Sequence, residues 1–154
     1  MKTKITEEEF KVLLANGVKD FSQYRMEVGR LACIGNNLTA LPELPRVEIL
    51  HCENNQLTAL PDLPNVECLC CNNNELKSLP ELPRVKYLYC PKNNLTALPE
   101  LPRVEVLYCN NNKLNSLPEL PSCLQLVCYK NKLTKLPYMP LIEYYDGIGN
   151  NFKK

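Results

Sequence analysis

The sequence predicts an α+β fold: a short N-terminal capping helix followed by a solenoid of short repeats that builds one parallel β-sheet. Two observations lead to this prediction. From residue 28 onward the same pattern returns every 19 residues without a gap. Each copy also holds a short apolar stretch whose alternate residues would face opposite sides of an extended strand. Units this short bury their apolar faces only by stacking, so we expect one continuous core.

Residues 1–27 lie outside the repeat and are expected to form an N-terminal cap with a helix at about residues 7–16. Thr6, followed three positions later by Glu9, matches the capping-box pattern of a helix start. One face of the helix would be apolar, formed by Phe10, Leu13 and Leu14. We expect the cap to cover the open end of the stack, which would otherwise expose apolar surface. The alternative is a helix that docks onto a partner.

Residues 28–154 are predicted to form a solenoid of seven units, the last one truncated, each with the pattern VxxLxCxxNxL. The cysteine column is Cys33, Cys52, Cys71, Cys90, Cys109 and Cys128, with Gly147 in the seventh place. The strand column, two residues earlier, is Leu31, Leu50, Leu69, Leu88, Leu107, Leu126 and Tyr145. Both columns are expected to face inward. The asparagine three residues after each cysteine is expected to donate to backbone carbonyls of its own coil and of the next coil.

The other half of each unit is marked by prolines. Twelve of the thirteen prolines lie in LPxLP pairs, from Pro42 and Pro45 through Pro137 and Pro140. Proline removes a backbone donor and disfavours helical geometry at the residue before it. We therefore expect a helix-free convex face of extended or polyproline backbone, opposite a concave face formed by the parallel sheet.

This unit resembles the leucine-rich repeat signature LxxLxLxxNxL, with valine in the first position and cysteine in the third. The LPxLP half is similar to the short repeats of secreted bacterial effectors, and of leucine-rich proteins of phages and large DNA viruses. The resemblance covers residues 28–152. It implies a leucine-rich repeat solenoid with a parallel sheet on the concave face. Fold alone does not fix the function.

Composition and charge limit the classes of partner and the cellular compartment that we expect. The formal net charge is +1, so charge gives no reason to expect nucleic acid or an anionic membrane as a partner. No apolar run of about 18 residues is present, so no membrane span is expected. The nine cysteines are odd in number and seven fall at core positions, which favours a reducing compartment over a disulfide scaffold. We expect a cytoplasmic protein, or one delivered to a host cytosol by a signal-independent route.

The candidate binding residues lie on the outward side of the strands, where the repeat leaves residue choice free. Five of the eight tyrosines fall at 21 such positions, far more than an even spread over 154 residues would place there. We expect a non-enzymatic module that binds a partner protein, and an effector or inhibitor directed at a host or a defence system is one such role. The alternative is that aromatic and β-branched residues simply suit strands. The expected contact residues are Ile49, His51, Cys68, Cys70, Tyr87, Tyr89, Val106, Tyr108, Val127, Tyr129 and Tyr144.

His51, Cys68 and Cys70 form a second pattern, because His51 lies one repeat before Cys70 in the same row. Two thiols and an imidazole suggest either a metal site or a thiol nucleophile. No fourth ligand is expected, because Glu53 lies one row further along the strand direction. A chance grouping on the surface is the default interpretation, so the sequence predicts no metal, no cofactor and no catalytic residue. A small ligand is a further alternative, although an open sheet encloses one poorly.

The last unit ends near Phe152 without a recognisable capping segment. Exposed apolar surface at the end of a solenoid favours association. The sequence therefore predicts a homodimer formed end to end through the C-terminal coil.

Overall fold

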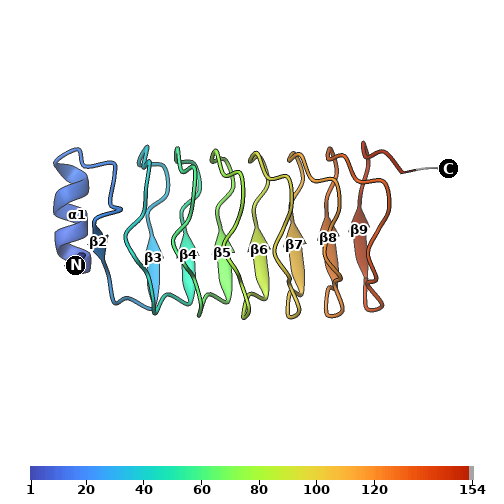
Figure 1. Ribbon diagram of the computed structural model, residues 1–154, viewed down its shortest axis with the longest axis horizontal. Helices are drawn as coiled ribbons and strands as arrows, with labels where there is room; N and C mark the ends of the chain where they lie inside the picture. Colours follow the sequence, from blue (N-terminus) through green and yellow to red (C-terminus); the bar gives the residue numbers. More distant parts are fainter. Residues whose placement is uncertain (153–154) are drawn as a thin grey trace.

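The computed structural model describes residues 1–152 and confirms the leucine-rich solenoid; the last two residues of the predicted repeat domain, 153 and 154, lie outside the described residues. Its coils stand side by side in one row, with the helix at one end and β9 at the other (Figure 1). The seven strands form one parallel sheet in chain order. They are β3 (Arg30–Ala32), β4 (Ile49–His51), β5 (Cys68–Cys70), β6 (Tyr87–Tyr89), β7 (Val106–Tyr108), β8 (Gln125–Val127) and β9 (Tyr144–Asp146).

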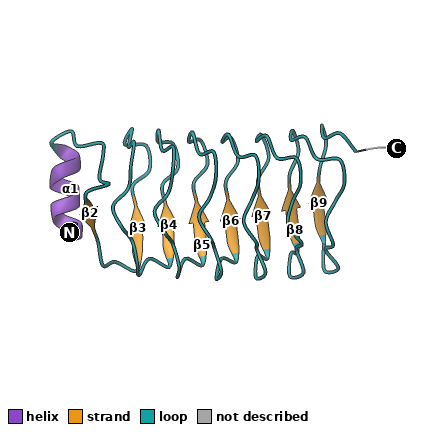
Figure 2. Cartoon of the chain, viewed as in Figure 1, coloured by secondary structure: helices purple, strands orange, loops and turns teal. Residues whose placement is uncertain are grey.

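Residues that pair across the sheet are one repeat length apart in the sequence. Leu50 pairs with Leu69, and Leu69 pairs with Leu88. Each column of the sequence therefore becomes a straight row across the sheet. The chain between β3 and β9 runs through turns and loops without a helix, as expected from the proline pairs (Figure 2).

The core follows the predicted columns. Six of the seven strand residues, Leu31 to Leu126, are buried, and so are all six thiols of the cysteine column. Burial raises the pKa of Cys33 and of Cys90 to about 12, so these side chains are neutral thiols at physiological pH. One continuous apolar cluster extends from Ile5 in the cap to Leu133 in the sixth coil.

The asparagine column links each coil to the one before it. Asn74 donates through Nδ2 to the carbonyls of Cys71 at 3.1 Å and Cys52 at 3.0 Å, and its Oδ1 accepts the backbone N–H of Leu57 at 3.0 Å. The expectation that this amide reaches the next coil is wrong in direction, because the carbonyl it meets belongs to the preceding one. The asparagine satisfies buried backbone groups that the tight coil leaves without a partner.

The residue before each asparagine adopts left-handed backbone geometry, a feature that the repeat signature does not state. The φ angles in this column lie between 54° and 75°. Such geometry costs energy for most residues and little for glycine or asparagine. The column reads Gly35, Asn54, Asn73, Lys92, Asn111, Lys130 and Gly149.

The cap contains helix α1 (Glu7–Ala15), where the predicted capping box between Thr6 and Glu9 forms. Phe10 packs against Phe21, with ring centroids 4.4 Å apart. No helix among residues 1–152 combines the length and apolar character that a membrane crossing requires.

The rest of the cap continues the solenoid further than the repeat pattern shows. Strand β1 (Thr3–Lys4) pairs with β2 (Tyr24–Arg25), and isolated bridges join Asp20 to Ala40 and Arg25 to Glu43. Phe21 and Met26 are fully buried within this segment. Residues 20–26 therefore form the proline-side half of an additional turn without its prolines. The domain boundary between residues 27 and 28 stays a prediction, since the core crosses it.

The last described coil departs from the inward pattern. Tyr145 takes the strand position normally held by leucine and remains 38% exposed. A Cβ atom at Gly147 would overlap the Tyr145 hydroxyl, which occupies the space of the missing cysteine. The substitutions at positions 145 and 147 therefore compensate each other.

Candidate interaction surface

The outward-facing strand residues form what we call the outer sheet face: the two flanking positions of each strand from β3 to β9 and the position that follows the cysteine column. Because the strands pair in register, Cys70 lies beside Tyr89, and Tyr89 lies beside Tyr108. The face changes in character along the row. Coils around β4 and β5 carry an imidazole, thiols and a carboxylate, whereas coils around β6 to β8 carry tyrosine and valine.

The part of the face around β6 to β8 forms what we call the tyrosine patch: Tyr87, Tyr89, Tyr108 and Tyr129 with Val106 and Val127. Tyr89 and Tyr108 meet edge to face, with ring centroids 5.2 Å apart and an angle of 75° between the rings. Both are half-buried, as are Tyr129 and Val106. Tyr87 is 39% exposed and is the most accessible member of the patch. The tyrosines therefore support each other and also present aromatic surface to solvent.

Other expected contact residues differ in how much surface they offer. Val127 and Cys70 are each only 9% exposed, so they contribute little area to any contact. Tyr108 extends toward β8, where its hydroxyl donates to Oε1 of Gln125 at 3.5 Å. Ile49 is half-buried at the edge of the thiol region, and Tyr144 is 53% exposed in the last coil.

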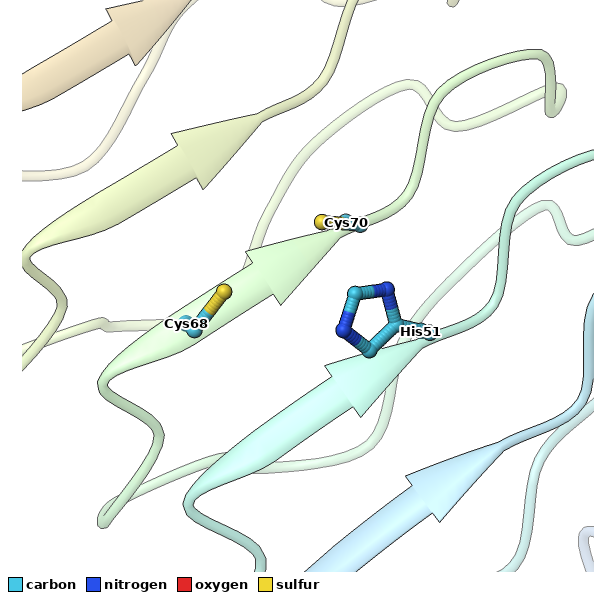
Figure 3. Close-up of side chains that lie close together, drawn as sticks. All are labelled: His51, Cys68 and Cys70. Carbon is cyan, nitrogen blue, oxygen red and sulfur yellow. The ribbon is translucent and has the colours of Figure 1, made fainter.

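His51, Cys68 and Cys70 come together as their rows predict. One ligand-type atom from each of the three side chains lies within 4.8 Å of the other two. The imidazole projects from β4 toward the two cysteines of β5 (Figure 3). Cys68 and His51 are half-buried and Cys70 is buried, so the cluster is set into the sheet face and not raised above it.

The expectation that Glu53 lies apart from this cluster is wrong. Nδ1 of His51 lies 3.3 Å from Oε1 of Glu53, and the other carboxylate oxygen is buried without a hydrogen-bond partner among the described residues. Side chains two residues apart on an extended segment share a side, and the glutamate is long enough to reach back to the imidazole. The sequence contained this signal in the spacing of His51 and Glu53.

The electrostatics of the cluster disfavour Cys70 as a nucleophile. Burial, followed by the neighbouring Cys68 and the charge of Glu53, raises the pKa of the Cys70 thiol to about 12. A nucleophilic cysteine needs a lowered pKa, because the thiolate is the reactive form. Cys70 is therefore a neutral thiol near pH 7 in the protein as it stands.

Two of the hollows in the molecule lie away from the tyrosine patch. One of about 490 Å³ is lined on the proline side by residues that include Leu44 and Leu60. Another of about 510 Å³ lies at the last coil and is lined by residues that include Tyr145 and Phe152. These hollows give no support to small-ligand binding at the tyrosines.

Comparison with known families agrees with this architecture. The sequence model described as "Leucine Rich repeats (2 copies)" matches residues 83–122. The chain is a leucine-rich repeat protein. A search of the curated proteins gave no match.

Solved structures extend the likeness to most of the chain. YopM from Yersinia enterocolitica WA-314 superposes with a TM-score of 0.76 and 39% identity, covering 80% of this chain and 29% of that one. A leucine-rich repeat domain of a Shigella effector gives 0.71 and 32%, covering 90% and 62%. YopM from Yersinia pestis, described as a leucine-rich effector protein, gives 0.52 and 28%, covering 79% and 43%. This leucine-rich repeat protein thus spans less than two thirds of each of these chains.

These similarities identify the repeats as those of bacterial effector-like leucine-rich proteins, and they support a protein-interaction module. That the chain is not an enzyme stays a prediction.

Proposed function

We propose that the protein binds another protein through the outer sheet face, with the tyrosine patch at the centre of the contact. The observation that carries this proposal is the exposed Tyr87 beside the paired rings of Tyr89 and Tyr108. Together with Val106 they form an aromatic and aliphatic surface on adjacent strands. Exposed surface of this composition is typical of interaction sites, where tyrosine supplies much of the binding energy.

The packing of the tyrosines suits recognition. Tyr89 and Tyr108 restrict each other's rings, so they lose little conformational freedom when a partner covers them. The Tyr87 hydroxyl donates to Oε2 of Glu105 at 3.5 Å, which leaves the ring on the surface with a polar group at its tip. A tyrosine in this setting offers apolar area and a hydrogen bond at once.

The proposed role is that of an effector or inhibitor directed at a protein of a host cell or of a defence system, acting in a cytosol. The two effector proteins among the similar structures, from Shigella and Yersinia pestis, support the role. The nine free cysteines support a reducing compartment. The net charge of +1 supports a protein partner over nucleic acid or an anionic membrane.

Site-specific photo-crosslinking tests the proposal and does not require the partner to be identified beforehand. A photoreactive phenylalanine derivative is placed at Tyr87 and, as a matched control, at Arg84, an exposed residue in the turn three positions before it. Both variants are expressed in the producing cells and introduced into candidate host cells. We expect a discrete crosslinked protein from position 87 and none from position 84. Equal products from both positions, or none from position 87, would contradict the proposal.

We also propose that the last coil forms a homodimer contact, as the sequence predicted. Ile148 is 81% exposed and Tyr144 is 53% exposed there, which is unusual for large apolar side chains. Sedimentation over a range of concentrations should show dimers that Ile148→Glu removes. A monomer at every concentration would contradict this contact.

A further inference from the structure

The cluster of His51, Cys68 and Cys70 has the donor set of a zinc site. Thiolate sulfur and imidazole nitrogen are the ligands that Zn²⁺ prefers in proteins, at about 2.3 Å and about 2.0–2.1 Å from the metal. In a tetrahedral site such bond lengths place the donor atoms roughly 3.5–3.8 Å from one another. The donor atoms here lie within 4.8 Å of one another, so modest side-chain rotations suffice.

The sheet fixes the backbone positions of these three residues. His51 and Cys70 are register partners on β4 and β5, and Cys68 shares β5 with Cys70 (Figure 3). On the other side of His51, its register partner is the small residue Ala32, which is exposed. The backbone that carries the three donors is therefore fixed by strand pairing, and a small neighbour leaves an approach to the imidazole from the solvent side.

Glu53 contacts the imidazole of His51 but is not itself one of the three donors. It lies against Nδ1 of His51, which can donate its proton to Oε1 and leaves Nε2 as the nitrogen with a free lone pair. A carboxylate that accepts from a histidine in this way fixes the tautomer and the ring orientation of metal-binding histidines. Glu53 also buries an oxygen with no hydrogen-bond partner among residues 1–152. Zinc bound at Nε2 would make the Nδ1 proton a stronger hydrogen-bond donor to this partly buried carboxylate.

We propose that the cluster binds one Zn²⁺ ion through Sγ of Cys68, Sγ of Cys70 and Nε2 of His51, with Glu53 as a positioning residue. Binding converts both thiols to thiolates and releases two protons, so the ion and its two sulfur ligands carry no net charge. Because all three ligands rise from the sheet, the fourth position of the tetrahedron points away from it and is filled by water. This zinc site does not presuppose the partner proposed for the tyrosine patch, although Cys68 and Cys70 pair in register with Tyr87 and Tyr89.

Titration of the fully reduced protein with Zn²⁺ against a chelating indicator tests the proposal. We expect one equivalent with a Kd below about 1 µM, and a rise in the unfolding temperature on zinc addition. Cys68→Ser and His51→Asn should each weaken binding by at least about tenfold, and Glu53→Gln by about 10- to 100-fold. Titration with Co²⁺ should give the absorption bands of a tetrahedral cobalt thiolate in the parent protein and lose them in Cys68→Ser.

The matched control is Cys123→Ser. Cys123 is a fully buried thiol outside the cluster that donates to the carbonyl of Gln125, and a serine hydroxyl can make the same bond. This variant should bind zinc like the parent protein. Circular dichroism confirms that each variant is folded before it is titrated. The proposal is overturned if the folded parent takes up no zinc at this affinity, or if Cys68→Ser and His51→Asn bind it as tightly as the parent.

Discussion

Leu88 and Tyr87 are neighbours in strand β6, yet they differ in almost every structural respect. Leu88 is fully buried, and the same residue stands in its row in six of the seven coils. Tyr87 is 39% exposed, and its row reads Arg30, Ile49, Cys68, Tyr87, Val106, Gln125 and Tyr144. Stacking restricts the inner side because each coil must fit the next. It leaves the outer side free, so the two candidate sites, the tyrosine patch and the thiol cluster, both lie there.

The largest expected effect comes from the inner side, at Asn74. Asn74→Ala removes three donated bonds and one accepted bond. It leaves the buried N–H of Leu57 without its partner, and the carbonyls of Cys52 and Cys71 each lose one of their two side-chain donors. We expect the free energy of unfolding to fall by about 3 kcal/mol or more, measured by urea denaturation. Asn72→Ala, on the outer side of the same coil, is the control and should change it by less than about 0.5 kcal/mol. Similar losses in the two variants would remove the distinction between the sides.

The last coil offers a second test of inner packing. Gly147→Cys restores the cysteine column but forces the new side chain into the Tyr145 hydroxyl, so we expect a loss of about 2 kcal/mol. Adding Tyr145→Leu should recover most of that loss, because leucine is the residue of this row in the other coils. Thermal unfolding of the two single variants and the double variant measures the coupling. Purely additive effects would show that the two positions are independent.

Substitutions in the tyrosine patch should lower stability less than those on the inner side. Tyr89→Ala and Tyr108→Ala should each cost about 1 kcal/mol of stability, since the rings are half-buried and pack on each other. A double-mutant cycle should return a coupling of about 0.5–1.5 kcal/mol between them. No coupling would mean that the edge-to-face contact contributes nothing to the fold, and that these tyrosines serve the surface alone.

The smallest expected effect is a gain in stability at Lys92, a lysine held at a φ of 55°. Lys92→Asn should stabilise the protein by about 0.5 kcal/mol, because asparagine tolerates left-handed geometry better. Lys113→Asn is the control, because Lys113 is also an exposed lysine outside the strands but is not among the residues with positive φ. Chemical denaturation measures the free energy of unfolding of both variants. Equal changes in the two would rule out backbone geometry as the cause.

Much of the fold could be predicted because the repeat length is constant. A fixed offset of 19 residues determines which residues pair across the sheet, so the burial of Leu69 and the pairing of His51 with Cys70 followed from counting. The cap could not be predicted in the same way. Phe21 and Met26 complete a turn beside the first coil, but they stand in a segment without the proline pairs that mark the others.

The row in which each site residue lies could be predicted from the sequence, but several of the side-chain contacts could not. Counting placed the three donors of the cluster side by side. The spacing of His51 and Glu53 allows a contact between them, but whether it forms depends on side-chain rotation, which the sequence does not specify. Nor do letters show that Val127 is buried on a face expected to be open, because that depends on how its neighbours are oriented. The left-handed column did leave a signal, since glycine or asparagine fills it in five of seven coils.

The central claim is that the inner side of each strand builds the solenoid and the outer side recognises a partner. The most direct test measures partner affinity and unfolding for two variants of adjacent residues in β6, using the partner identified by crosslinking. We predict that Tyr87→Ala weakens binding by about tenfold and leaves stability unchanged. Leu88→Ala should lower the free energy of unfolding by about 3 kcal/mol while its folded fraction binds normally. Unchanged affinity in folded Tyr87→Ala would contradict the account.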